Sequence, residues 1–364
     1  MPKHWVNAAP SLRIILLLAL ILLGMFATSV YPAFIEQYYS EGLFPYISGA
    51  LRGVFNYIPF SIGDLAYLAF IIWTIWGSIQ LIVHLLKRQL KKAVNLCLRG
   101  IIVFQVLLLL FYSLWGLNYF RQPAAQLLSM QDTSYTFTDI KSLSVGMIDS
   151  LNSCRKELAT ADFNVNNSTI FTLSQSAVKH LQQLNPKMSG WNPCIKSSLF
   201  TPLLNYMGTS GYNNPFTGEA QLNSEMPVVD RPITACHEMA HQLGFAREDE
   251  ANFAGFLAGS RSPNRLLRYS SYYLATEELL YYIRHRDTVE HKELLARLSR
   301  PVKADFKADS LYWTHYEGRI DRITGLFYNE FLKANKQPAG LHTYNRMIIL
   351  LVAWYRQQQK IAVK

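Results

Sequence analysis

Three long apolar stretches in the first third of the chain restrict its fold more than any other feature. They cover residues 14–34, 65–86 and 101–118, and the first contains no charged residue. An α-helix rises 1.5 Å per residue, so about 20 apolar residues cross a hydrocarbon core of about 30 Å. A cleaved signal peptide is an alternative for the first stretch, but two further stretches follow it. We therefore predict three transmembrane helices within a membrane domain of residues 1–118.

The basic residues around these stretches predict their orientation. Lys3 and Arg13 precede the first stretch, whereas the loop at 35–64 has a single Arg52 against three acidic residues. Short loops rich in Lys and Arg stay in the cytoplasm. Five more basic residues separate the second and third stretches: Lys87, Arg88, Lys91, Lys92 and Arg99. The N-terminus is thus expected in the cytoplasm, with the chain after residue 118 outside it.

The net charge of +10 is partly explained by this basic loop. Such a loop faces anionic lipid, so the expected partner of these charges is the membrane. Elsewhere the sequence has no basic run with interleaved aromatic residues. We therefore predict no binding of nucleic acid.

The remaining two thirds of the chain predict a folded domain of the α+β class outside the cytoplasm. Residues 119–137 have the polar composition of a linker, and residues 138–364 form the domain. Apolar spacing predicts a mainly helical scaffold, whereas Pro and Gly punctuate short apolar pieces in residues 190–227 and predict a small β-sheet there. Helices are expected near residues 139–159, 170–184, 234–242, 247–258, 265–286, 294–306 (interrupted at Pro301), 316–333 and 344–358.

Three of the four cysteines lie in the outer part of the chain. Cys154 and Cys194 are a candidate disulfide in an oxidising compartment, although spacing cannot set connectivity. Cys236 directly precedes the motif described next, and we interpret it as a small buried residue.

The segment His237-Glu238-Met239-Ala240-His241 is an HExxH motif. Residues four apart share one face of a helix, so His237 and His241 can direct two imidazole nitrogens at one point, with Glu238 beside it. This pattern is typical of zinc hydrolases. A chance match is the alternative, because short motifs of this kind also arise in helices without a metal.

A catalytic zinc site needs a third protein ligand. Gly244 occupies the position at which the chain turns in metzincin peptidases. The position of their third ligand, however, is occupied here by Arg247, which stays protonated and cannot bind a cation. The following residues, Glu248 to Asn252, resemble the ExxA(D/N) element of gluzincin peptidases. That resemblance implies that Glu248 is the third ligand and that Asn252 orients a ligand histidine through a hydrogen bond. Glu250 is the alternative third ligand.

Over a wider span the chain resembles an uncharacterised family of bacterial membrane proteins with a zinc-metallopeptidase-like domain of the zincin type. The resemblance rests on three membrane helices followed by PFTGEA and HEMAHQLGFAREDEANF. It implies a zincin-like fold, a Zn²⁺ cofactor, and a multi-pass protein of the bacterial inner membrane with a periplasmic domain. It supplies no substrate.

The sequence thus predicts a membrane-anchored zinc metallopeptidase, a hydrolase that acts on a peptide or protein. Zinc lowers the pKa of its bound water, and Glu238 is expected to accept the proton as general base. We predict that residues 216–223 form an exposed edge strand for substrate, with an ordinary hairpin as the alternative. The candidates for stabilising the oxyanion are Tyr272, Tyr273, His315, His342, Tyr344 and Arg346.

Two other functions remain open at this stage. The outer domain could bind zinc as part of a membrane sensor that needs a partner protein, because the cytoplasmic loop is too short to be an output domain. It could also be a non-catalytic interaction module. Oligomeric state cannot be predicted from this sequence.

Overall fold

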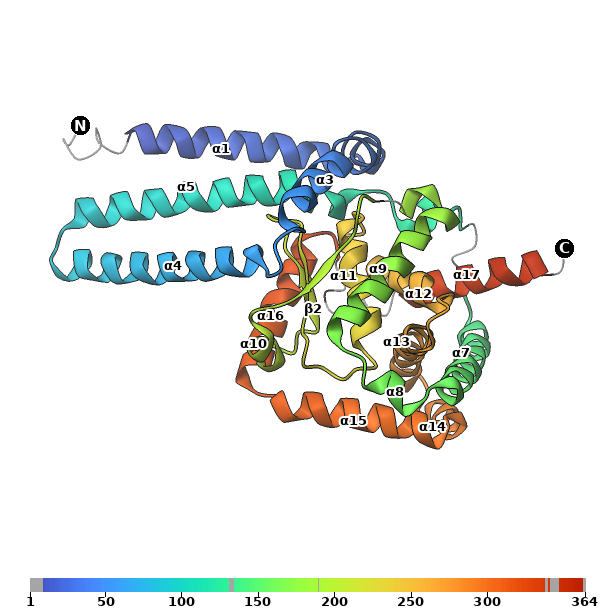
Figure 1. Ribbon diagram of the computed structural model, residues 1–364. Helices are drawn as coiled ribbons and strands as arrows, with labels where there is room; N and C mark the ends of the chain where they lie inside the picture. Colours follow the sequence, from blue (N-terminus) through green and yellow to red (C-terminus); the bar gives the residue numbers. More distant parts are fainter. Residues whose placement is uncertain (1–8, 131–133, 189, 338–339, 341–346, 363–364) are drawn as a thin grey trace.

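The computed structural model describes residues 9–130, 134–188, 190–337, 340 and 347–362 (Figure 1). Three long helices extend from one side of a mainly helical domain that contains a small three-stranded sheet. The predicted α+β class with an N-terminal helical bundle is therefore confirmed.

The three long helices are α1 (Ala9–Thr28), α4 (Ile62–Leu86) and α5 (Leu90–Leu114). Each is long and apolar enough to cross a membrane, and almost none of their apolar surface is buried. The third helix begins at Leu90 rather than at residue 101, so the predicted basic loop shrinks to Lys87–Gln89. Lys91 and Lys92 lie in the first turn of α5, where long basic side chains keep their charges in water while the backbone stays helical.

The segment between α1 and α4 is helical rather than a loop. It comprises α2 (Pro32–Phe34), the π-helix η1 (Ile35–Leu43) and α3 (Phe44–Phe55). This segment packs against η2 (Gly116–Phe120), a 3₁₀ turn that follows α5, and both contribute to one buried cluster.

The stretch expected to be a linker starts as packed structure. Tyr119 and Phe120 are buried, and α6 (Ala124–Leu127) follows. Arg121 is also buried: its guanidinium donates to both carboxylate oxygens of Glu36, at 2.9 and 2.6 Å, and to the carbonyl of Gly244 at 3.0 Å. Residues 29–61 together with residues 115–121, which we call the membrane-side segment, are thus tied through Arg121 to the mainly helical domain that follows, which we call the outer domain.

The scaffold of the outer domain begins with α7 (Phe137–Glu157), α8 (Thr160–Phe163), α9 (Asn167–Leu184) and the turn η3 (Pro186–Met188). Thr136 and Asp139 form a capping box that starts α7, and the side chain of Asn166 caps α9. Both helices place apolar residues in the main core of the domain.

The sheet has the order β1-β3-β2. Strand β1 (Ile195–Ser197) pairs parallel to β3 (Ala220–Leu222), with Ile195 opposite Ala220. Strand β2 (Gly211–Asn213) pairs antiparallel to β3, and the short helix α10 (Thr201–Tyr206) lies between β1 and β2 in the chain. The prediction of an exposed edge at residues 216–223 is therefore wrong: β3 is buried and bonded on both sides, whereas β1 and β2 are the two edge strands. The alternative of a hairpin is confirmed, because β3 pairs antiparallel with β2, the strand that precedes it.

The motif lies on α11 (Arg231–Gln242), which packs between the sheet, α9 and α12 (Glu248–Ser260). The helix begins at Arg231 rather than at Thr234, with Pro232 in its first turn, where a missing N–H costs nothing. The chain continues through α13 (Arg265–Arg284), α14 (Thr288–Arg297), α15 (Arg300–Tyr316), α16 (Arg319–Ala334) and α17 (Met347–Ala362). Pro301 starts α15 instead of interrupting a helix.

The four cysteines are free, so the candidate disulfide between Cys154 and Cys194 does not form. Cys154 is buried on α7, whereas Cys194 precedes β1. Cys236 is fully buried on α11, as predicted.

Replacing Arg121 by leucine should destabilise the protein strongly. Glu36 would remain buried without its partner, and an uncompensated buried charge costs about 3–5 kcal/mol. We expect a large drop in the thermal unfolding midpoint of the detergent-solubilised protein. The control is Lys187→Ala. It removes a partly exposed ion pair to Glu41, which lies in η1 as Glu36 does, and should cost about 0–1 kcal/mol. Equal midpoints for the two variants would contradict this account.

Candidate metal centre

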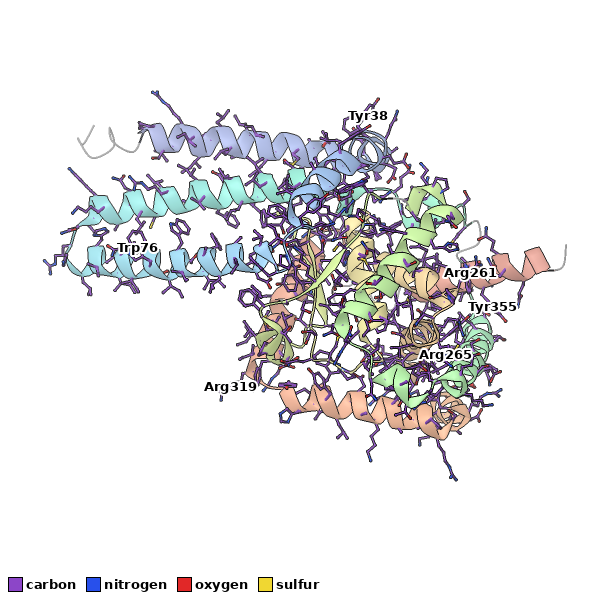
Figure 2. The ribbon with its side chains drawn as sticks, in the orientation of Figure 1. Tyr38, Trp76, Arg261, Arg265, Arg319 and Tyr355 are labelled. Carbon is purple, nitrogen blue, oxygen red and sulfur yellow. The ribbon has the colours of Figure 1, made fainter. Side chains whose placement is uncertain are left out.

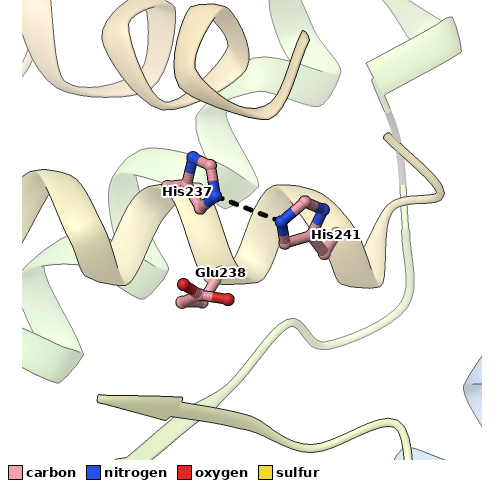
Figure 3. A group of neighbouring side chains, drawn as sticks. All are labelled: His237, Glu238 and His241. Carbon is pink, nitrogen blue, oxygen red and sulfur yellow. Dashed lines mark hydrogen bonds between the residues drawn. The ribbon is translucent and has the colours of Figure 1, made fainter. Parts of the chain in front are cut away.

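The two histidines of the motif lie one turn apart on the buried face of α11 (Figure 3). Their Nε2 atoms are 3.1 Å from each other. Two imidazole nitrogens this close cannot both present lone pairs to each other, so the arrangement requires a proton or a cation between or beside them.

The outer nitrogen of each ring is held by an oxygen acceptor. His237 Nδ1 lies 2.7 Å from Asn252 Oδ1, and His241 Nδ1 lies 2.7 Å from the carbonyl of Phe245. Both oxygens favour a proton on Nδ1, which leaves Nε2 as the ligand atom. The sequence predicted that Asn252 orients one of the two histidines without specifying which, and the structure pairs it with His237.

Glu248 reaches the same point from the next helix. Gly244, with a φ of +86°, reverses the chain after α11, and Glu248 begins α12. Its Oε2 atom lies 3.2 Å from His237 Nε2 and 3.7 Å from His241 Nε2. Ligand atoms about 2.0–2.2 Å from a tetrahedral zinc ion are roughly 3.3–3.6 Å apart. The three separations of 3.1, 3.2 and 3.7 Å lie just outside that range, so small shifts of the side chains would accommodate such an ion.

Glu250, the alternative ligand, is directed elsewhere. Its Oε1 atom accepts from the backbone N–H of Ala124 at 2.8 Å and from Arg247 at 3.1 Å. Its carboxylate is thus engaged with the segment that follows the long apolar helices. Between the two glutamates, the distances favour Glu248.

Glu238 lies beside the two histidines on the side of the sheet (Figure 3). One carboxylate oxygen is within 4.8 Å of both imidazoles, and a Cβ atom on Gly211 in β2 would approach Glu238 Oε1 to 2.8 Å. Among the described residues, none bonds to Glu238 Oε2, although the side chain is buried. Burial raises the pKa of Glu238 to about 7, in the range that suits a general base or acid near neutral pH.

The charges of the group are coupled. Burial lowers the pKa of His241, but the carboxylates of Glu248 and Glu238 and the carbonyl of Phe245 together outweigh this effect, so that the pKa is raised to about 9. Burial would raise the pKa of Glu248, yet both histidines together hold it well below its usual range. The carboxylate of Glu248 thus lies where it favours a positive charge at the two imidazoles.

Residues from the membrane-side segment cap the C-terminal end of α11. Trp115 Nε1 donates to the carbonyl of His241 at 2.9 Å, and Arg52 Nη1 donates to that of Gln242 at 2.8 Å. Arg121 donates to Gly244, as described above. Carbonyls at a helix end have no partner within the helix, and cations there also interact favourably with the helix dipole. Sequence analysis missed these residues because more than 100 positions separate them from the motif.

One further tyrosine contacts the group. Tyr328 on α16 donates from its hydroxyl to Glu248 Oε1 at 2.6 Å. It was not among the predicted tyrosines, and nothing in the local sequence distinguishes it from the other tyrosines of the C-terminal half.

The predicted oxyanion candidates within the described residues have other contacts. The ring of Tyr272 packs on Phe256, that of Tyr273 stacks on Phe306, and that of His315 contacts Tyr316. The remaining three candidates, His342, Tyr344 and Arg346, lie outside the described residues.

The comparison with known protein families covers both parts of this chain. The family model described as protein of unknown function (DUF3810) matches residues 39–352. The chain belongs to the DUF3810 family. The match runs from η1 through two of the apolar helices and the HExxH motif into α17. No curated protein and no solved structure matches the chain.

The description of the DUF3810 family names neither a metal nor an activity. It bears out the resemblance to an uncharacterised family and leaves the zincin part of that resemblance as a proposal. The roles of His237, Glu238, His241, Glu248 and Asn252 likewise remain predictions, for which the geometry above supplies the argument.

Strand β2 approaches Glu238 so closely at Gly211 that a side chain at this position has no space. A Cβ atom there would also lie 2.8 Å from the backbone oxygen of Gln221, so Gly211→Ala must displace β3 or Glu238. We expect a loss of about 1–3 kcal/mol in thermal unfolding. Gly49→Ala is the matched control, because Gly49 lies in α3 with no atom within 4 Å of an added Cβ. That variant should be neutral or slightly stabilising, and an equal loss at both sites would refute the close contact.

Proposed function

We propose that this DUF3810 protein is a membrane-anchored zinc metallopeptidase. The observation that carries the proposal is the convergence of His237 Nε2, His241 Nε2 and Glu248 Oε2 within 3.7 Å of one another, beside the carboxylate of Glu238. Two imidazoles and one carboxylate are a common ligand set of catalytic zinc, which keeps one position open.

In this proposal, His237, His241 and Glu248 hold the ion. Zinc bound there supplies Lewis-acid chemistry, which acidifies water and polarises a carbonyl oxygen. Asn252 and the carbonyl of Phe245 keep both imidazoles in the tautomer with Nε2 free, and Tyr328 fixes the carboxylate of Glu248. Such neighbours orient metal ligands and tune affinity.

Glu238 is the proposed general base. Its Oε2 atom is free of partners among the described residues, and its pKa of about 7 allows it to take a proton from water and return it to the leaving amine. A peptide substrate would align along β2, the edge strand next to Glu238. In strand addition, the backbone of an extended peptide pairs with such an edge.

The location of the site is also a proposal. The beginning of α1 and the turn between α4 and α5 lie at the end of the bundle far from the outer domain (Figure 1). Arg13, Lys87 and Arg88 are at that end, which the positive-inside rule places in the cytoplasm. The outer domain then lies in the periplasm of a bacterium, with the membrane and a peptide or protein as its partners.

Burial favours a second candidate function. His237, Glu238, His241 and Glu248 are all less than one tenth exposed. A site so enclosed also suits a zinc ion that is bound without hydrolysis, in a membrane sensor or an interaction module. The two experiments below separate these functions.

Metal analysis of purified variants tests the ligand set. We expect about one zinc per chain in the parent protein, loss of zinc in Glu248→Ala, and retention in Glu250→Ala. Glu250→Ala is the matched control, since it removes a buried carboxylate two residues away that contacts Ala124 and Arg247 instead. Loss of zinc only in Glu250→Ala would exclude Glu248, and a parent protein without bound metal would exclude both zinc functions.

Hydrolysis of a peptide library, followed by mass spectrometry, tests the role of Glu238. Glu238→Gln should retain zinc and lower the cleavage rate by about 10²–10⁴. Asn252→Ala should act differently, with zinc affinity reduced by about 10–100-fold. Equal cleavage by Glu238→Gln and the parent would disprove the base. Zinc bound by a parent protein that cleaves nothing would favour the second candidate.

A further inference from the structure

Helix α16 carries an exposed apolar stripe. Ile320, Ile323, Phe327 and Phe331 follow a helical spacing and are 48, 53, 76 and 37 % exposed. Leu326, at 69 %, lies next to them. A single exposed apolar side chain is ordinary. A contiguous row of such side chains along a helix, however, marks a surface that contacts lipid or another protein.

The face of α16 turned toward the protein is comparatively polar. Tyr328 on this face reaches Glu248, and only Leu332 is fully buried along the helix. Arg319 and Arg322 are exposed on a third face. The helix therefore has the reverse of the usual arrangement, in which the apolar side faces the core.

The stripe runs into the surface of the membrane helices. The ring of Phe331 lies 6.0 Å from that of Phe111, in the last turn of α5, and 6.0 Å from that of Tyr119. Just beyond α16, Asn335 Oδ1 accepts from Tyr112, and Lys336 donates to the carbonyl of Ser29 after α1. The C-terminal end of α16 is thus anchored at the outer ends of two apolar helices.

The rest of α16 lies on the side of the outer domain that faces the long helices and runs across their direction (Figure 1). Figure 2 labels Arg319, its first residue, on that side. The neighbouring segment at α10 adds exposed Leu199 and Leu203, and the N–H of Leu199 bonds to Asp64 at the start of α4. Exposed apolar residues therefore gather at the level where the helices leave the bilayer.

We propose that α16 lies in the lipid–water interface, with its stripe of Ile320, Ile323, Phe327 and Phe331 among the upper acyl chains. Lipid is the occupant because the stripe continues into the apolar surface of α5, and because Arg319 and Arg322 flank it as basic residues flank interfacial helices. The inference rests on the proposal that α1, α4 and α5 cross a bilayer, and it does not depend on zinc or on hydrolysis. One face of α16 then contacts lipid while Tyr328 on another contacts Glu248.

The test uses a polarity-sensitive fluorophore attached to single cysteines in the full-length chain. Cys97 and Cys194 are first replaced by serine, because the other two cysteines are buried. Labels at Phe327→Cys, Val289→Cys and Ile75→Cys are compared in vesicles with and without lipids that carry a nitroxide on the acyl chain. Val289 is exposed on the distal helix α14, and Ile75 is exposed in the middle of α4.

At positions 327 and 75 we expect blue-shifted emission and quenching of the fluorescence by the nitroxide lipids. At position 289 we expect neither effect. Quenching at 75 without quenching at 327 would overturn the lipid contact while preserving the membrane helices. A blue shift at 327 without quenching would show that a protein surface covers the stripe. Absence of quenching at 75 would overturn the membrane embedding and this inference together.

Discussion

The capping of helix α11 at its C-terminal end is the interaction on which the rest of this structure depends. Three carbonyls at and just beyond that end accept hydrogen bonds from Trp115, Arg52 and Arg121. All three donors belong to the membrane-side segment, and Arg121 is itself held by Glu36. Because buried carbonyls without partners are costly, the outer domain and the membrane-side segment stabilise each other. The membrane-side segment, which connects the long helices to the outer domain, is thus part of the support of the candidate site.

This support explains how one short helix can align the proposed ligands. His241 lies in the capped turn, and its Nδ1 atom bonds to the carbonyl of Phe245, whose ring lies 5.3 Å from the guanidinium of Arg121. The turn at Gly244 then returns the chain so that Glu248 meets both imidazoles. A ligand set of this kind requires positions fixed within a fraction of an ångström, which buried hydrogen bonds provide.

The same arrangement brings the candidate site close to the proposed membrane surface. Strand β2 lies beside Glu238, and Tyr212 of that strand bonds to Asp64 at the start of α4. Helix α16 contacts Glu248 through Tyr328 and carries its apolar stripe on another face. The proposed peptidase site would therefore lie near the proposed membrane surface.

The sequence by itself determined the features that depend on local regularity. The length of each apolar run predicts a membrane helix, and the spacing of His237 and His241 puts two imidazoles on one helical face, because 3.6 residues form a turn whatever the surroundings. The α+β class followed from the same periodicities, with errors of a few residues at most ends of the predicted helices and of about one turn or more at α1, α5, α14 and α15.

Only the tertiary structure decided which groups meet across long separations. The sequence leaves both Glu248 and Glu250 as possible ligands, with Glu248 favoured only by a resemblance. The turn at Gly244 together with the bond from Ala124 to Glu250 separates them. The central position of β3 and the caps from Arg52 and Trp115 likewise depend on pairings between distant segments. The pattern of α16 predicts an amphipathic helix but not the direction of its apolar face, since periodicity is the same whether that face meets the core or a lipid surface.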